Sequence, residues 1–137
     1  MKAVVPLSNF WEWSGGFGVI MEWVSGVGSS YPFSFYSDKK CQDFYQKTIK
    51  DIMSRVNTIN GIRYSEDSTI MAWQLANEPR VGDCGVYTTW ITNTAKFIKN
   101  LTTFQLVSVG NEGSITPCHT VTWNVKEVDY VTFHAWA

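Results

Sequence analysis

An amide and a carboxylic acid side chain, Asn77 and Glu78, stand directly after an apolar run of the chain. The run, Thr69–Leu75, is typical of a buried strand, so both polar residues are expected where that strand leaves the sheet. Pro79 disfavours the right-handed helical region for the residue before it, which predicts an extended Glu78. A carboxylate held at a strand end among aromatic residues suits general acid–base catalysis; the alternative is a solvated carboxylate in an ordinary loop.

Polar and aromatic residues recur wherever another apolar run ends. These pairs are Asn9 and Trp11 after Ala3–Leu7, Asn111 and Glu112 after Phe104–Val109, and His134 and Trp136 within Asp129–Ala137. The carboxyl ends of parallel strands meet at one edge of a sheet, so these side chains are expected to converge there. Strict alternation along a strand would point Asn77 and Glu78 to opposite faces, and a bulge or break would be needed for both to reach one ligand.

Two amphipathic stretches separate the apolar runs and are predicted to be helices. The first begins at Ser37-Asp38, repeats apolar residues every three or four positions, and ends at Asn60-Gly61. The second spans Val86–Leu101. Two further segments show no clear periodicity and are expected to be loops: Phe17–Tyr36, with a short helical turn near Val19–Val24 as an alternative, and Ser114–Lys126.

The order strand, helix, strand, helix, strand, loop, strand predicts an α/β fold with about four parallel strands. Functional residues at every strand end favour part of a (β/α)₈ barrel, since no Gly-x-Gly-x-x-Gly or P-loop supports a nucleotide-binding doubly wound sheet. A complete barrel takes about 250 residues and eight strands, whereas this chain has 137 residues. We therefore expect residues 1–137 to be the middle segment of one larger domain, without its first two and last two strands.

Composition excludes several classes of partner. The formal net charge is −1 and 45% of the residues are hydrophobic, which gives no reason to expect nucleic acid or an anionic membrane as partner. No run of about 18 apolar residues is present, so no membrane span is predicted, and no signal peptide is visible. Seven Trp and six Tyr residues suit both a core and a groove that stacks flat apolar faces, as sugar rings present.

The cysteines suggest a bridge but no metal site. Cys41, Cys84 and Cys118, with the two histidines, lack the spacing of a zinc site, so no metal is expected. Cys84 and Cys118 each follow a predicted strand; if those strands are parallel neighbours the two could be bridged, and otherwise both thiols are free. Asn100-Leu101-Thr102 is an N-glycosylation sequon, which matters only for a secreted protein.

Five segments in order resemble glycoside hydrolase family 5, and particularly its endo-β-1,4-mannanases. Ala72–Arg80 contains Asn-Glu-Pro, the hallmark of the family's fourth strand. The other segments are similar to the family's third-strand loop (Leu7–Gly16), the approach to its fourth strand (Arg55–Ile70), its fifth-strand loop (Val109–Gly113) and its sixth-strand end (Asp129–Trp136). The resemblance covers essentially the whole chain as strands three to six.

The resemblance implies a role for each matching residue. These roles are general acid/base for Glu78, recognition of the sugar 2-hydroxyl for Asn77, an active-site histidine for His134, an aromatic site position for Trp136, and lining of the glycone side for Asn9 and Trp11. The family's nucleophile is a glutamate on the seventh strand, which is not in this chain. The resemblance implies no cofactor.

A retaining glycosidase needs two carboxyl groups about 5–5.5 Å apart. Glu78 supplies one. Glu112 and Glu12 are candidates for the second group, but both are interpreted as carboxylates of a loop or of the surroundings of the site. For Glu78 to act at mildly acidic to neutral pH its pKa must be raised, by burial and by the nucleophile's charge.

The resulting expectation is a secreted, monomeric endo-glycosidase that cuts β-1,4-mannan with retention of configuration. The 137-residue segment alone is expected to be inactive. The alternatives are another family 5 activity, such as an endo-β-1,4-glucanase, and a non-catalytic carbohydrate-binding protein that uses the aromatic loops.

Overall fold

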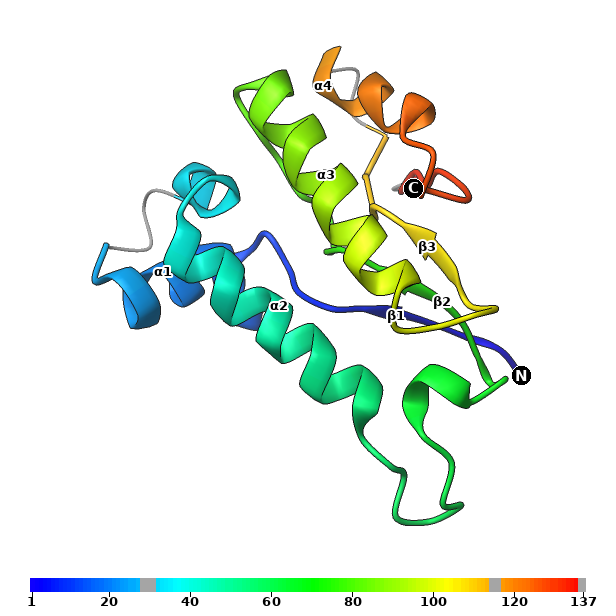
Figure 1. The fold of residues 1–137 in the computed structure, drawn as a ribbon. Coiled ribbons are helices and arrows are strands. Elements are labelled where there is room, and N and C mark those ends of the chain that lie inside the picture. The colour runs from blue at the N-terminus through cyan, green and yellow to red at the C-terminus, as the bar shows by residue number, and fades with distance from the viewer. Residues whose placement is uncertain (28–31, 114–116, 136–137) are drawn as a thin grey trace.

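The computed structural model describes residues 1–27, 32–113 and 117–135 and shows an α/β arrangement (Figure 1). Its strands are β1 Ala3–Pro6, β2 Ile70–Gln74 and β3 Leu106–Ser108, and its α-helices are α1 Phe17–Ser25, α2 Lys39–Ser54, α3 Cys84–Lys99 and α4 Pro117–Thr120. Short 3₁₀ helices are η1 Glu12–Ser14, η2 Pro32–Tyr36, η3 Tyr64–Glu66 and η4 Val121–Asn124.

The strands form one parallel sheet in the order β1-β2-β3. Val5, Trp73 and Val107 lie side by side across it, and each strand is joined to the next through a long helix (Figure 1). A parallel connection of this kind brings every strand back in the same direction, so all three carboxyl ends lie at one edge. That edge carries the candidate site.

The long helices form where the periodicity predicts them. Asp38 caps α2 by accepting a hydrogen bond from the Cys41 N–H at 2.8 Å, and the predicted apolar stripe supplies its buried side chains. Both helices pack on the same face of the sheet, around the fully buried Trp73 (Figure 1). The indole of Trp73 donates to Gln105 Oε1 at 2.6 Å, so its one polar atom is satisfied inside the core.

The segment predicted as a loop from Phe17 to Tyr36 contains the nine-residue helix α1, which includes the helical turn offered as an alternative at Val19–Val24, and the 3₁₀ helix η2. Local propensity is poor there, because Gly18 and several β-branched residues weaken a helix. Tertiary packing decides the outcome: Phe17 is fully buried and stacks on Phe35 with ring centroids 3.9 Å apart. The burial of these rings outweighs the weak local preference. A count of periodic residues along the chain cannot detect this long-range packing.

Helix α2 ends at Ser54, before the predicted Asn60-Gly61 stop. The residues between form a separate turn, in which Asn57 Oδ1 accepts from the Ile59 N–H at 2.9 Å and the Gly61 N–H donates to the Asn57 carbonyl at 2.8 Å. Asparagine side chains commonly compete with the helical ladder in this way. Gly61 does mark a turn, but the turn lies beyond the helix.

The fourth predicted strand, Asp129–Ala137, does not form within the described residues 129–135. The Asp129 N–H donates to the Val107 carbonyl at 2.8 Å, but the Val107 N–H donates to the Asp129 side chain at 2.6 Å, which interrupts a regular ladder. The segment runs beside the end of β3, with the His134 N–H donating to the Glu112 carbonyl at 2.8 Å. Before it, α4 and η4 replace part of the predicted loop Ser114–Lys126.

A disulfide joins Cys84 to Cys118, which confirms the bridged alternative. It ties the start of α3 to α4 across a sequence separation of 34 residues. Replacing both cysteines by serine in the full-length protein is expected to lower the free energy of unfolding by about 3–4 kcal/mol, since the bridge restricts the unfolded chain. Equilibrium unfolding with and without a reductant measures this. An unmodified protein insensitive to the reductant would contradict the prediction.

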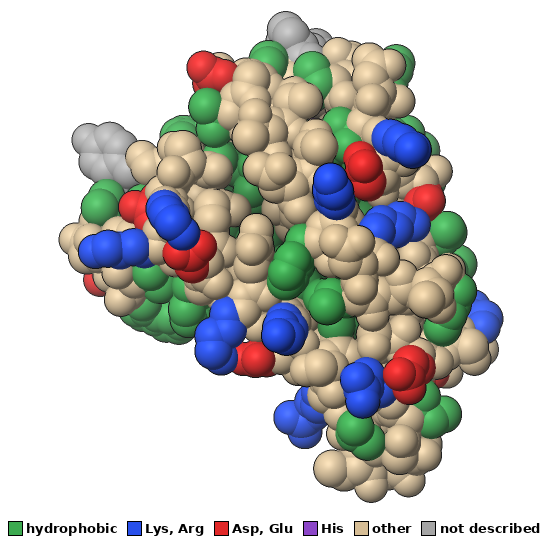
Figure 2. Space-filling view, viewed as in Figure 1, with side chains coloured by type: hydrophobic (Ala, Val, Ile, Leu, Met, Phe, Trp, Pro, Cys, Tyr) green, Lys and Arg blue, Asp and Glu red, His purple; other side chains and the backbone are tan. Residues whose placement is uncertain are grey.

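The surface over α2 and α3 mixes charges of both signs (Figure 2). Two of the pairs are Lys39–Asp43 and Lys47–Asp51, each spaced four residues apart on α2. Such exposed pairs contribute only a few tenths of a kcal/mol each. Among the described residues, no helix is both long and apolar enough to cross a membrane.

Candidate active site

Two backbone contacts fix the end of β2 in the site. Asn77 pairs with Asn9 as an isolated parallel bridge beyond β1, with the Phe10 N–H donating to the Asn77 carbonyl at 3.0 Å. On the other side, the Glu78 N–H donates to the Gly110 carbonyl at 2.9 Å. The segment carrying Asn77 and Glu78 is therefore held from both neighbouring chain segments, which limits the positions its side chains can take.

Glu78 is not extended, contrary to the prediction from Pro79. Its φ is +51°, in the left-handed region, and it is the only non-glycine residue with positive φ in the described chain. Proline constrains the preceding residue against the right-handed region, and the chain satisfies this by turning the other way. Such a conformation costs on the order of 1–3 kcal/mol and is typical of functional sites. It also breaks the strict alternation, so Asn77 and Glu78 both line one cavity.

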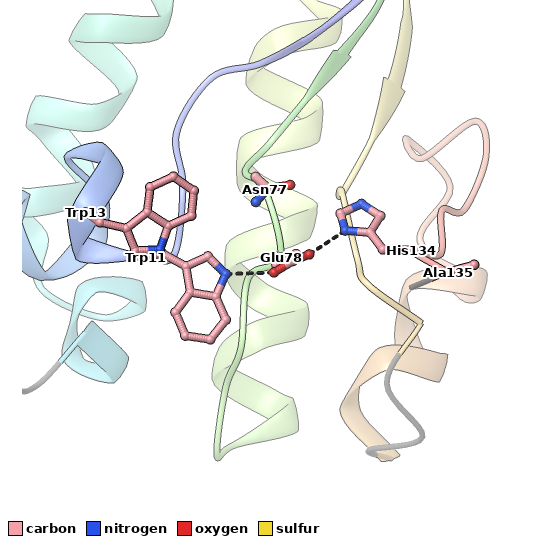
Figure 3. A pocket seen from close by; sticks show the side chains of 6 residues that line it. All are labelled: Trp11, Trp13, Asn77, Glu78, His134 and Ala135. Atoms are coloured by element: carbon pink, nitrogen blue, oxygen red, sulfur yellow. Dashed lines mark hydrogen bonds and ion pairs between the residues drawn. The ribbon is translucent and has the colours of Figure 1, made fainter. Parts of the chain in front are cut away.

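Both carboxylate oxygens of Glu78 are hydrogen-bonded (Figure 3). The indole Nε1–H of Trp11 donates to Oε2 at 2.7 Å, and His134 Nδ1 lies 2.5 Å from Oε1. Only 7% of the Glu78 surface is exposed. Trp11 and His134, two residues far apart in sequence, thus converge on the Glu78 carboxylate, as the strand-end pattern predicts.

The environment lowers the pKa of Glu78 from its ordinary value. Burial is the largest single influence and raises the pKa, but hydrogen bonds from His134 and Trp11, with the electrostatic influence of His134 and Arg80, together outweigh it. Within this chain the direction is therefore opposite to the expected increase. Burial, the first of the two expected causes of an increase, does raise the pKa, but the other influences outweigh it. The second expected cause is the negative charge of another carboxylate near Glu78.

Arg80, to which the sequence assigned no role, and Glu112, interpreted as a loop carboxylate, are neighbours of the site. Arg80 forms a two-pronged ion pair with Glu112, Nε to Oε1 at 2.9 Å and Nη2 to Oε2 at 3.0 Å. The same guanidinium lies over the Trp11 ring, 4.7 Å from its centroid. Glu112 is thereby engaged as a partner of Arg80, which agrees with its interpretation as a loop carboxylate. The sequence signal that could have identified Arg80 is its position directly after Pro79.

A cavity of about 600 Å³ lies beside Glu78; Figure 3 shows the side chains that line it. The described residues that line it are Trp11, Trp13, Asn77, Glu78, His134 and Ala135. Four of the six predicted site residues are therefore together. Trp13 also lines the cavity; the sequence leaves sugar stacking and loop packing equally open for this tryptophan of the aromatic loop.

Asn9 and Trp136 stand apart from the other predicted site residues. Asn9 is absent from the described cavity lining and instead accepts hydrogen bonds from the Trp11 N–H at 3.1 Å and from Asn77 Nδ2 at 3.4 Å. It positions two residues that do line the cavity. Trp136 lies outside the described residues.

Comparison with known proteins gives a consistent family match. The family model described as GH family 5 beta-mannosidase-like matches residues 1–137. The chain is 31% identical to mannan endo-1,4-beta-mannosidase 5 of Solanum lycopersicum over 99% of its own length, and 36% identical to a probable mannan endo-1,4-beta-mannosidase A of Aspergillus niger over 82%. It spans 38% and 27% of the lengths of these relatives, respectively.

Solved structures show the same likeness. A glycoside hydrolase family 5 mannosidase from Rhizomucor miehei superposes with a TM-score of 0.88 at 34% identity, over 99% of this chain and 36% of that one. An endo-β-1,4-mannanase from Thermotoga petrophila gives 0.87 at 27% identity, over 97% and 33%. These enzymes are (β/α)₈ barrels, which confirms the predicted fold class; the described part of this chain has three strands in place of about four. The chain belongs to glycoside hydrolase family 5, in its beta-mannosidase-like group.

Proposed function

We propose that the full-length protein is a retaining endo-glycosidase that hydrolyses β-1,4-linked mannan. The proposal rests on the environment of Glu78. This buried carboxylate lies at a strand end, faces a cavity lined by tryptophans, and is hydrogen-bonded to Trp11 and His134. Among the similar structures, a variant of the Rhizomucor miehei mannosidase with a glutamate replaced by alanine was solved in complex with mannosyl-fructose. An oligosaccharide substrate for this protein is consistent with that complex.

In this mechanism Glu78 protonates the leaving glycosidic oxygen and later removes a proton from the incoming water. Each carboxylate oxygen has two lone pairs, and the indole Nε1–H of Trp11 can only donate. The proton of the acid form must therefore sit on a lone pair that Trp11 does not use. This arrangement leaves a position on Glu78 for the glycosidic oxygen, while Trp11 and His134 keep the carboxyl group in place.

The other half of the site is proposed to lie on a strand outside this chain. We take residues 1–137 as the third to sixth β/α units of a single catalytic barrel, with the nucleophile glutamate on the seventh strand. A negative charge about 5–5.5 Å from Glu78 would raise the pKa of Glu78 toward the range that acid catalysis requires. The disulfide is consistent with an extracellular enzyme, which we propose to be monomeric.

The test is release of reducing sugar by the full-length protein from mannan and from cellulose. Faster release from mannan, with products of several chain lengths, is the expected result. Preference for cellulose would replace the proposal by an endo-β-1,4-glucanase. Binding of mannan without hydrolysis would replace it by a carbohydrate-binding protein.

Replacing Trp11 by Phe is expected to move the basic limb of the pH–activity profile to higher pH by roughly one unit. The Trp11 donor stabilises the ionised form of Glu78, so its removal raises the pKa and keeps the acid protonated to higher pH. The control is Trp13→Phe, since Trp13 lines the same cavity but makes no hydrogen bond to Glu78 among the described residues. Equal shifts in both variants would contradict the role given to Trp11.

A further inference from the structure

We propose that Asn100 carries an N-linked glycan, at the end of the fold opposite the candidate active site. Asn100-Leu101-Thr102 is the only Asn-x-Ser/Thr triplet among the 137 residues. The Cys84–Cys118 disulfide is an independent feature pointing to an oxidising compartment, and the endoplasmic reticulum combines such conditions with glycan transfer. Together, the triplet and the disulfide support a glycan at Asn100, and this inference does not depend on the proposed hydrolysis.

The local structure leaves the Asn100 side chain available. Asn100 is exposed and is the C-cap of α3, a role it fulfils through its backbone N–H, which donates to the Lys96 carbonyl at 3.1 Å. Within the described residues its side-chain amide makes no hydrogen bond. A glycan on its Nδ2 would therefore extend into solvent without breaking a contact of the fold.

The position of Asn100 keeps a glycan away from the cavity. Helix α3 leads from the carboxyl end of β2 back to the amino end of β3, so it begins near the site and ends at the opposite edge of the sheet (Figure 1). Glu78 lies at the carboxyl end of β2, before α3 begins, whereas Asn100 follows its last turn. A glycan there does not obstruct access of a polysaccharide to Glu78.

Thr102 shows that the transfer must precede folding. Its hydroxyl is buried, donates to the Ser65 carbonyl at 3.1 Å and accepts from the Gln105 N–H at 3.4 Å, so the folded protein does not present the complete triplet. In the transfer, Asn100 Nδ2 forms a bond to the anomeric carbon of a lipid-pyrophosphate-linked oligosaccharide. The bond from that carbon to the pyrophosphate breaks, the lipid pyrophosphate leaves with the bonding electrons, and the proton lost by the amide is taken up by a base.

The experiment is peptide mass mapping of the full-length protein secreted by a eukaryotic host, before and after treatment with peptide N-glycosidase. The expected result is a glycan on the Asn100 peptide, with Asn100 converted to Asp after enzymatic release. Asn100→Gln should remove the whole glycan mass, and the matched control Asn124→Gln, at an exposed asparagine outside any triplet, should retain it.

Thr102→Ser separates the triplet from the fold, because serine preserves both the recognition sequence and the buried hydroxyl. This variant is expected to remain glycosylated, whereas Thr102→Ala would lose stability as well and is not a clean probe. An unmodified Asn100 peptide in the secreted protein, or a glycan that persists in Asn100→Gln, overturns the proposal. Neither result depends on whether the protein hydrolyses mannan.

Discussion

Replacing Glu78 by Gln in the full-length protein is expected to lower kcat on mannan by roughly 10²–10⁴-fold, the range of a general acid–base contribution. Glutamine keeps the size of the side chain, and its carbonyl oxygen can still accept the Trp11 hydrogen bond, but it cannot deliver a proton. Binding of manno-oligosaccharides should remain nearly intact. The measurement is kcat and KM on mannan together with the affinity for an oligosaccharide.

Two controls make this prediction specific. Glu112→Gln changes a neighbouring carboxylate that is paired with Arg80, and is expected to cost about tenfold at most. An aryl glycoside with a good leaving group needs no proton in the first step, so Glu78→Gln should lose far less of that step than of mannan cleavage. Losses of equal size at Glu78 and Glu112, or equal losses on both substrates, would refute the acid/base assignment.

The convergence of the site could be predicted from the sequence because it follows from topology. Parallel strands joined by helices place their carboxyl ends at one edge, where Trp11 and Glu78 follow β1 and β2. His134 reaches the same edge on the segment beside the end of β3, where its backbone N–H donates to the Glu112 carbonyl. The register of buried apolar residues in α2 was equally accessible, since a helical period determines which face is buried. These features depend on patterns that repeat along the chain.

The features that could not be predicted depend on single long-range contacts. The rule for a residue before proline excludes one region of φ and ψ, but the turn at Glu78 is selected by contacts with Gly110, Trp11 and His134. Helix α1 forms because the Phe17 ring packs against the rings of Phe35 and Tyr36. Likewise, the Asp129 carboxylate accepts a hydrogen bond from the Val107 N–H of β3, and a fourth strand would have used that donor.

Replacing Gly110 by Ala in the full-length protein is expected to lower the free energy of unfolding by about 3 kcal/mol or more. Gly110 has a φ of +91°, and a Cβ added there would lie 1.9 Å from the Ala76 carbonyl oxygen. That oxygen belongs to the backbone at the end of β2 and cannot rotate away. The variant must therefore separate the ends of β2 and β3, in addition to the strain of a left-handed residue. Chemical denaturation measures the loss.

Gly61→Ala isolates the contribution of the clash. Gly61 has a φ of +71°, but nothing lies within 4 Å of the position that its Cβ would occupy, so only the left-handed strain of about 1–2 kcal/mol should appear. The Gly110 carbonyl accepts the Glu78 N–H, so separating the strand ends should displace Glu78 and reduce activity even where the variant remains folded. Similar unfolding free energies for the two alanine variants would show that the close approach of Gly110 to Ala76 does not support the site.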